Sequence, residues 1–282
     1  MSAGPFAAAA PGPSDTMASM SPRSAAVDDT TSGTLARGLT ILEFVADKGR
    51  VGVGEIAAEL GISRSAAYRL VSQLRDRRFL AEPHEGAGLQ LGGKSIRLGL
   101  RALGSADLLQ LAAVRLRHLV ADVRETAFLA TVDYDAVVYV LQEVGPSAVT
   151  MTARPGNLRP LYCTGLGKAY LSALPAADRD SIVSRLNLRP VTARTITDVD
   201  TLRAELDVTA TRGYAIDNGE LEPEVRCIAA PVLDHGGRPI AAISVGGPTD
   251  RILAREDVIA SALLATAGAL SQDLGAPGPR SP

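Results

Sequence analysis

The hydrophobic pattern over residues 54–74 predicts two short helices joined by a tight turn. Ile56 and Leu60 share one helical face, and Gly61 follows them, as suits the left-handed backbone at many helix ends. Ser63 then offers an N-cap for a second helix. The buried stripe of that helix is expected to be Ala67, Leu70, Val71 and Leu74. This arrangement has the form of a helix–turn–helix.

The opposite face of the second helix is polar and basic. Hydroxyl and guanidinium groups on such a face reach base edges and phosphates when the helix lies in the DNA major groove. The candidate DNA contacts are Arg64, Ser65, Tyr68, Arg69, Ser72, Arg75 and Arg78. The alternative is a solvated helix of an ordinary α-hairpin, since arginines on surface helices are usually just solvated. The turn glycine, the capping serine and the mixed basic and aromatic face together favour DNA binding.

The flanking pattern extends this pair to a winged helix–turn–helix domain over residues 33–92. A preceding helix is expected to begin with Thr34 as its N-cap and to end before Gly49. Its apolar stripe is predicted to be Leu35, Leu39, Leu42 and Val45 or Ala46. Residues 79–82 and 89–91 predict two short strands around a glycine-bearing loop. Three helices followed by such a hairpin indicate a wing that reaches the DNA backbone.

A linker helix over residues 93–104 is expected to connect this domain to a second one over residues 105–274. Its apolar positions Ile96, Leu100 and Leu103 are candidates for a dimer contact. After an interruption at Gly104, Ser105 is expected to cap a long helix. The stripe of that helix is Leu109, Ala112, Leu116, Leu119 and Val123.

The second domain combines strand and helix patterns without regular βα alternation. The expected strands are residues 127–132, 136–141, 149–152, 228–233 and 240–245. The expected helices are one entered from a loop within 161–171, and others at 175–186, 198–212 and 256–270. Strands that follow one another as hairpins among irregularly placed helices indicate an α+β fold with an antiparallel sheet.

Composition supports two folded domains with tails. A chain of 282 residues that is 46% hydrophobic can bury two cores. Residues 1–32 and 275–282 are rich in Ala, Pro, Ser and Gly and are expected to be disordered. No apolar run has the roughly 18 residues that a membrane span requires, and the start lacks a secretory pattern. A cytoplasmic protein without a membrane partner is therefore expected.

Charge and cysteine content narrow the function further. The net charge is −2, yet between Arg64 and Arg101 eight basic residues stand against three acidic ones. Such a basic block suits a DNA-binding module beside a neutral or acidic domain. Cys163 and Cys227 have neither C-x-x-C spacing nor a nearby histidine pair, so no zinc site, disulfide framework or cofactor is expected.

Several motifs in order resemble the IclR family of bacterial transcriptional regulators. They are residues 35–42 (LARGLTIL), the helix–turn–helix, and residues 164–169 (TGLGKA), 212–217 (RGYAID), 225–232 (VRCIAAPV) and 242–248 (AISVGGP). The resemblance covers roughly residues 34 to 273. It implies a winged-helix domain, a linker helix and a GAF-like effector-binding domain. It also implies homodimers or tetramers on palindromic double-stranded operators, controlled by a small metabolite that is often a carboxylate or an aromatic acid.

The same resemblance implies an effector pocket. Its residues would be Gly165 and Leu166 through their backbone, with Asp217, Cys227 and Ser244 through their side chains. Consecutive N–H groups at a helix start favour an anion, which agrees with a carboxylate effector. Glu224 stands where the family usually has a glycine, so the pocket rim is expected to differ from that of relatives.

Each pocket residue also has a plainer alternative role. Cys227 in an apolar strand is commonly a small buried hydrophobe. Asp217 could be a turn residue bonded to its own backbone. Ser244 could be an ordinary sheet hydroxyl, and Gly165 and Gly167 could serve helix packing.

Two other classes compete with a DNA-binding regulator. In an enzyme, Cys163 or Cys227 would be the nucleophile, with His118 or His235 as the base. These histidines lie in no recognisable acid–base motif, so no catalytic residue is expected. A ligand-sensing module without DNA function is the other rival. The acidic cluster Asp217, Glu220, Glu222 and Glu224 could bind a metal, but closely spaced surface carboxylates are more often solvated, so no metal is expected.

Overall fold

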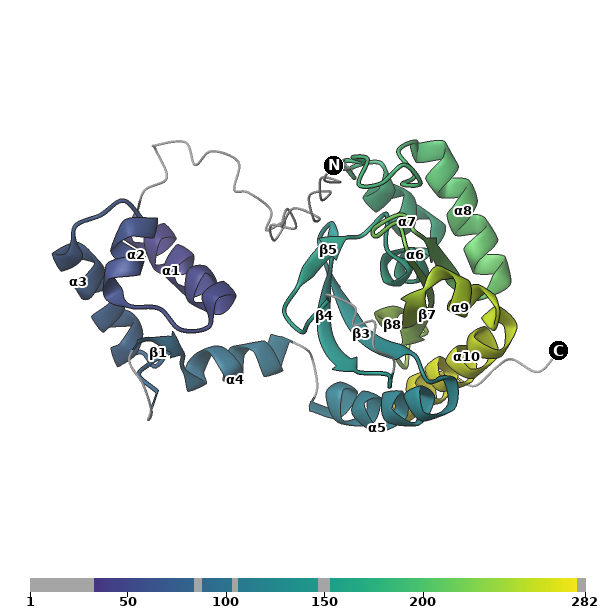
Figure 1. Ribbon diagram of the computed structural model, residues 1–282, viewed down its shortest axis with the longest axis horizontal. Helices are drawn as coiled ribbons and strands as arrows, with labels where there is room; N and C mark the ends of the chain where they lie inside the picture. The colour runs from purple at the N-terminus through teal and green to yellow at the C-terminus, as the bar shows by residue number, and fades with distance from the viewer. Residues whose placement is uncertain (1–32, 84–87, 103–105, 147–152, 278–282) are drawn as a thin grey trace, which may run out of the picture. The chain divides into compact units, whose positions relative to one another are not determined.

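The structure is a computed structural model, and it describes residues 33–83, 88–102, 106–146 and 153–277 (Figure 1). Two compact units, Met1–Ser95 and Ile96–Pro282, make up the chain, and each is described by itself. Several expectations fall outside the described residues. These are the tail 1–32, the wing loop 84–87, the linker end at Leu103, Gly104 and Ser105, the strand at 149–152, and residues 278–282.

The first unit is a winged helix–turn–helix, as predicted. Its elements are α1 (Thr34–Lys48), α2 (Val53–Glu59), α3 (Arg64–Asp76), β1 (Leu80–Ala81) and β2 (Gln90–Leu91). β1 and β2 are antiparallel, and a further bridge joins Val51 to Leu89. The core consists of Ile41, Val45, Val51, Ile56, Ala57, Ala67, Val71, Leu80 and Leu89.

The turn between α2 and α3 has the predicted chemistry. Gly61 has a φ of +62°, a left-handed conformation that suits glycine. The Ser63 hydroxyl accepts a hydrogen bond from the Ala66 N–H at 3.3 Å, so this serine caps α3. Glycine and serine therefore end one helix and begin the next.

The predicted stripe of α1 is correct at Val45, which is buried, and at Leu42, which packs against the core, but wrong at Leu35 and Leu39. Ile41 and Val45 are the buried residues of this helix, whereas the side chains of Leu35 and Leu39 are 77% and 52% exposed. Apolar residues surround much of α1, so spacing alone cannot choose the face that packs against α3 and β2. The helix also begins one residue early, with Gly33 rather than Thr34 at its N-cap.

The second unit is built on a six-stranded antiparallel sheet with the order β5-β4-β3-β8-β7-β6 (Figure 1). Its strands are β3 (Thr126–Asp133), β4 (Ala136–Glu143), β5 (Leu158–Pro160), β6 (Ala215–Asn218), β7 (Val225–Leu233) and β8 (Pro239–Pro248). The expected α+β fold is confirmed. The short edge strands β5 and β6 were not predicted, because three or four residues give too little alternation to detect.

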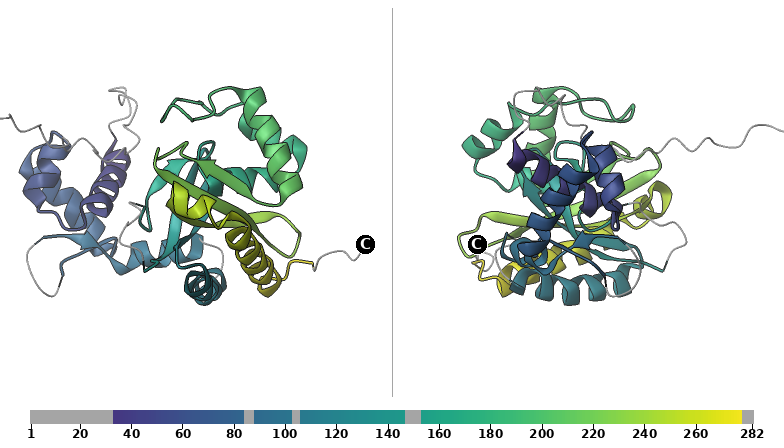
Figure 2. Two further views of the ribbon diagram at one scale, coloured as in Figure 1. Left: turned by 45° about the vertical axis from the view of Figure 1, so that its right-hand side comes forward. Right: turned by 90° about the vertical axis from the view of Figure 1, so that its left-hand side faces the viewer.

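Helices cover both faces of this sheet (Figure 2). The helices of the second part of the chain are α4 (Gly93–Ala102), which spans the division, α5 (Ala106–Val123), α6 (Gly165–Ser172), α7 (Ala176–Val183), α8 (Val199–Arg212), α9 (Thr249–Leu253) and α10 (Glu256–Asp273). The expected cap of α8 at Asp198 and its end at Gly213 are both present. Among helices in the described ranges, none has the length and apolar character for crossing a membrane.

The alternation of side chains along β3 separates two cores. Ala127 and Leu129 belong to the core formed with α5 and α10, while Phe128 and Ala130 belong to the core formed with α6 and α8. Helix α6 packs against β7, β8 and α8. Its first residue, Gly165, lies beside Asp217 of β6 and Ala229 of β7, and the cavity described below lies at this end of the helix.

Candidate DNA-binding surface and effector cavity

The solvent face of α3 carries six of the seven predicted DNA-contact residues, and Arg78 lies two residues beyond the end of the helix. All seven are exposed to solvent: Arg64, Ser65, Tyr68, Arg69, Ser72, Arg75 and Arg78. Tyr68 is 60% exposed, although a tyrosine ring gains from burial. Tyr68, Arg69 and Ser72 line a surface groove that the wing base, at Glu82 and Gly88, completes. This face therefore offers hydroxyl, guanidinium and aromatic groups together.

The flanking arginines differ in their surroundings. The Arg75 Nη1 donates to the Glu82 Oε1 at 2.6 Å, an exposed ion pair that joins α3 to the wing. Arg64 lies back against the start of α2, beside Gly54. Arg78 has a left-handed φ of +64° where the chain turns from α3 toward β1. The pairing of Arg75 was not predicted, and it reduces the positive charge that this residue presents.

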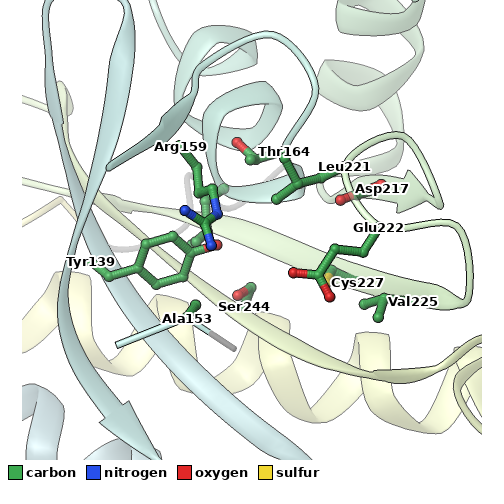
Figure 3. A pocket seen from close by; sticks show the side chains of 12 residues that line it. Tyr139, Ala153, Arg159, Thr164, Asp217, Leu221, Glu222, Val225, Cys227 and Ser244 are labelled. Carbon is green, nitrogen blue, oxygen red and sulfur yellow. The ribbon is translucent and has the colours of Figure 1, made fainter. Parts of the chain in front are cut away.

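One cavity in the second unit brings the five predicted effector residues together (Figure 3). It is lined by Tyr139, Ala153, Arg159, Thr164, Gly165, Leu166, Asp217, Leu221, Glu222, Val225, Cys227 and Ser244. The unfilled space is about 400 Å³ including the opening, but the centre of a water molecule can occupy only about 20 Å³ of it. That is room for about one water. A metabolite therefore requires movement of half-buried side chains such as Arg159 and Glu222.

The N-terminus of α6 faces this cavity with available donors. The Thr164 hydroxyl caps the helix by accepting from the Gly167 N–H at 3.1 Å. The N–H groups of Gly165 and Leu166, in the first turn, have no intrahelical acceptor. These two groups are thus the natural place for an anionic ligand atom.

The two glycines of this turn differ in how closely other atoms surround them. A Cβ on Gly167 would overlap the carbonyl group of Leu161, so the packing role considered for this residue is correct. A Cβ on Gly165 would lie 3.4 Å from the Ala229 Cβ and 3.7 Å from the Asp217 Cβ, which is ordinary contact. The space around Gly165 therefore does not by itself require a glycine.

Asp217 lies in β6, directly opposite Cys227 of β7, and is 4% exposed. Its Oδ1 accepts from the Glu220 N–H at 2.8 Å, so the local turn role is also present. Burial raises the pKa of Asp217 to about 7, despite the opposing effect of that N–H donor. Near neutral pH the cavity therefore contains a mixture of acid and carboxylate at this position.

A buried ion pair lies next to Asp217. Lys168 of α6 is 1% exposed, and its Nζ pairs with the Glu220 carboxylate, with Glu205 of α8 at 3.8 Å. Burial raises the pKa of Glu220, and the ammonium of Lys168 opposes that rise. The view that these carboxylates are solvated is wrong for Asp217 and Glu220. Within the described residues, no group of three His, Cys, Asp or Glu side chains could hold a metal ion.

Sequence reasoning missed Lys168. A lysine inside the apolar segment that follows Gly165 was the available signal, because a charge at such a position requires a buried partner. Glu224, the residue at the unusual rim position, is exposed, whereas its neighbour Glu222 lines the cavity. The acidic side chain at the cavity rim is thus that of Glu222 rather than that of Glu224.

The thiols do not have the properties of nucleophiles. Burial raises the pKa of Cys163 to about 12 and that of Cys227 well above its usual value. A reactive cysteine needs a lowered pKa. Neither His118 nor His235 is among the described residues that line the cavity. The enzyme alternative therefore has no support in this geometry.

Comparison with known proteins gives matches along both units. Residues 34–83 match the model of the IclR helix-turn-helix domain. Residues 100–272 match the model of the bacterial transcriptional regulator IclR C-terminal domain.

Individual proteins agree with these matches. The chain is 34% identical over 242 residues to the uncharacterized HTH-type transcriptional regulator RhmR of Escherichia coli, covering 86% of this chain and 93% of that protein. It is 32% identical over 211 residues to the HTH-type transcriptional regulator KdgR of Dickeya chrysanthemi, covering 75% of this chain and 69% of that protein. A crystal structure of an IclR homolog from Microbacterium hydrocarbonoxydans, complexed with 4-hydroxybenzoate, is similar with a TM-score of 0.74. The two sequences are 26% identical, and the match covers 86% of this chain and 99% of the other.

Proposed function

Because this chain belongs to the IclR family of bacterial transcriptional regulators, we propose that α3 reads a palindromic operator and that a small organic acid in the cavity controls this binding. The family assignment makes the protein a transcriptional regulator with a DNA-binding and an effector-binding domain, not an enzyme. The palindrome, the contact residues and the nature of the effector are the parts that we propose.

The exposed face of α3 supports the DNA part of the proposal. Arg69 and Tyr68 project from the centre of this helix, and no ion pair among the described residues holds Arg69. A free guanidinium can contact guanine O6 and N7 with two hydrogen bonds. Ser65 and Ser72 on the same face suit base edges or phosphates. A two-fold symmetric protein would read each half of a palindrome with one such helix.

The cavity supports the effector part. The observation that supports it most is that one cavity brings together two kinds of group. The N–H groups of Gly165 and Leu166 have no intrahelical acceptor, and beside them lie the buried side chains of Asp217 and Ser244 and the half-buried Cys227. The similar protein from Microbacterium hydrocarbonoxydans binds 4-hydroxybenzoate, a carboxylate that also carries a hydroxyl. For regulation, the effector must bind the DNA-competent and incompetent states with different affinities.

Footprinting on the protein's own promoter tests the DNA contact. We expect Arg69→Ala to relax sequence specificity and to cost about 1–3 kcal/mol, because a bidentate base contact is lost. Lys48→Ala, at an exposed position at the end of α1, is the matched control and should protect the same site as the wild type. Unchanged protection by Arg69→Ala would remove this residue from the interface.

A second variant tests the cavity. We expect Ser244→Leu to abolish the response to an organic acid that a thermal-shift screen identifies, because the larger side chain fills the space. Operator binding by the ligand-free protein should stay intact in a gel shift. A full response in this variant would place the effector elsewhere in the domain.

A further inference from the structure

The cavity has a second polar wall that the proposed carboxylate site does not use. Tyr139 of β4 is only 6% exposed and packs edge-on against Phe128, with ring centroids 5.2 Å apart. Its hydroxyl forms no hydrogen bond with the described residues, and in Figure 3 it points into the cavity beside the guanidinium of Arg159. The hydroxyl is therefore open to a hydrogen bond with a water or a ligand in the cavity.

Arg159 is the one cationic side chain among the described residues that line the cavity. Its hydrogen bond to a described residue is to the carbonyl of the adjacent Leu158, at 3.2 Å. It has no ion pair with any described residue. A half-buried guanidinium in this situation keeps most of its donors available for an anion.

The sheet register explains why these two side chains meet. Arg159 of β5 stands opposite Val137 of β4, and Tyr139 lies two residues further along the same strand. Directly paired residues, and residues two apart on one strand, share a face of a sheet. Val137 and Tyr139 both belong to the core on the α6 side. Arg159 therefore faces the same cavity from the sheet edge.

We propose that Tyr139 and Arg159 form a second anion-binding pole and that the effector is a small dicarboxylic acid. This proposal rests on the proposed effector function of the cavity. One carboxylate would accept from the N–H groups of Gly165 and Leu166, and the other from the guanidinium and the phenol. An arginine can hold a carboxylate through two parallel hydrogen bonds, and the phenol adds a third donor.

Glu222 sets a limit on this pole. Its carboxylate lines the same cavity, so it repels a dianion unless the second carboxylate lies on the Arg159 side. A variant without this charge, Glu222→Gln, should therefore bind a dicarboxylic acid more tightly than the wild type. The same substitution should change the binding of a monocarboxylic acid less.

Calorimetry on the full-length protein tests the proposal. The probes are straight-chain dicarboxylic acids from malonate to adipate, each matched to the monocarboxylic acid of equal carbon number. At least one diacid should bind tenfold or more tightly than its match. Arg159→Gln should remove that difference, Tyr139→Phe should reduce it, and Arg159→Lys should restore part of it. Arg154→Gln, an exposed arginine that does not line the cavity, is the control and should bind like the wild type.

The outcomes separate this proposal from the proposed function. Suppose that diacids and monoacids bind equally well and that Ser244→Leu abolishes the binding of both. That result would support the proposed effector cavity and overturn the second anion-binding pole. Preference for a hydroxy monocarboxylic acid over every diacid would overturn it as well. If neither diacids nor monoacids bind, the proposal of a dicarboxylic acid effector is overturned. Footprinting with Arg69→Ala tests DNA binding independently of this result. Circular dichroism melting of each variant confirms that it is folded.

Discussion

At the scale of single residues, Asp217 combines a structural hydrogen bond with a position in the cavity wall. One carboxylate oxygen accepts from the Glu220 N–H, and the side chain also lines the cavity beside the N-terminus of α6. An ionised Asp217 would repel a carboxylate effector bound at Gly165 and Leu166. Burial removes part of this conflict, because it favours the protonated form.

Effector binding should therefore depend on pH through Asp217. With a pKa of about 7 in the folded protein, this group is mostly neutral at pH 6 and mostly charged at pH 8. We expect affinity for an anionic effector to fall as pH rises through this range, by at most about tenfold per pH unit. Binding should also take up part of a proton, which calorimetry in buffers of different ionisation enthalpy measures.

Substitution separates this effect from general changes in charge. Asp217→Asn should bind the effector with little pH dependence between pH 6 and 8. Asp133→Asn, which changes an exposed aspartate of β3, should keep the wild-type slope. An unchanged slope in Asp217→Asn would assign the proton to another group of the cavity.

At the scale of elements, the ion pair between Arg75 and Glu82 joins α3 to the residue that directly follows β1. Both side chains are at least half exposed, so the pair contributes little to stability in water. Its larger effect is on charge, because Glu82 neutralises an arginine on the face that we assign to DNA. Glu82 of the wing thus reduces the net positive charge of the α3 surface.

Removing this acid should strengthen DNA binding. We expect Glu82→Gln to bind operator and non-specific DNA more tightly than the wild type. If Arg75 then neutralises one more phosphate, the slope of log affinity against log salt should steepen by about 0.9. Glu59→Gln on α2, which removes an exposed acid with no ion pair to a described residue, is the control. Equal slopes for the two variants would show that Arg75 already contacts phosphate in the complex.

At the scale of the whole molecule, each unit presents apolar side chains to solvent. On α1 these are Leu35 and Leu39, and on α4 the side chain of Ile96 is 60% exposed. Exposed apolar side chains that lie near one another on one helix are typical of surfaces that pair with another chain. A symmetric dimer would cover such surfaces twice and would match a palindromic site.

Light scattering tests this assembly. We expect the wild-type protein to be a dimer or a tetramer at micromolar concentration. The double variant Leu35→Lys/Leu39→Lys should shift the protein toward monomer, because two charges would then be buried at the interface. Tyr134→Ser changes an isolated exposed residue in the turn between β3 and β4 and should leave the mass unchanged. A monomeric wild type, with and without DNA, would contradict the prediction.

Much of the fold could be predicted from local pattern, because local chemistry determines where elements begin and end. Gly61 and Ser63 mark the turn of the helix–turn–helix, and Asp198 and Gly213 bound α8, all through hydrogen bonds or backbone angles within a few residues. The five residues that we propose for the effector site were chosen through motif resemblance, and the structure brings them to one cavity. Such motifs locate residues without describing what surrounds them.

Only the tertiary structure decided which of several apolar faces is buried and which polar groups meet. Leu39 and Ile41 of α1 are equally apolar, and packing against α3 and β2 selects Ile41. Lys168 and Glu220 are 52 residues apart, yet they form a buried pair. The register of β4 with β5 likewise brings Arg159 next to Tyr139. Periodicity within one segment contains no information on such pairs, because burial and charge pairing arise from the contacts between segments.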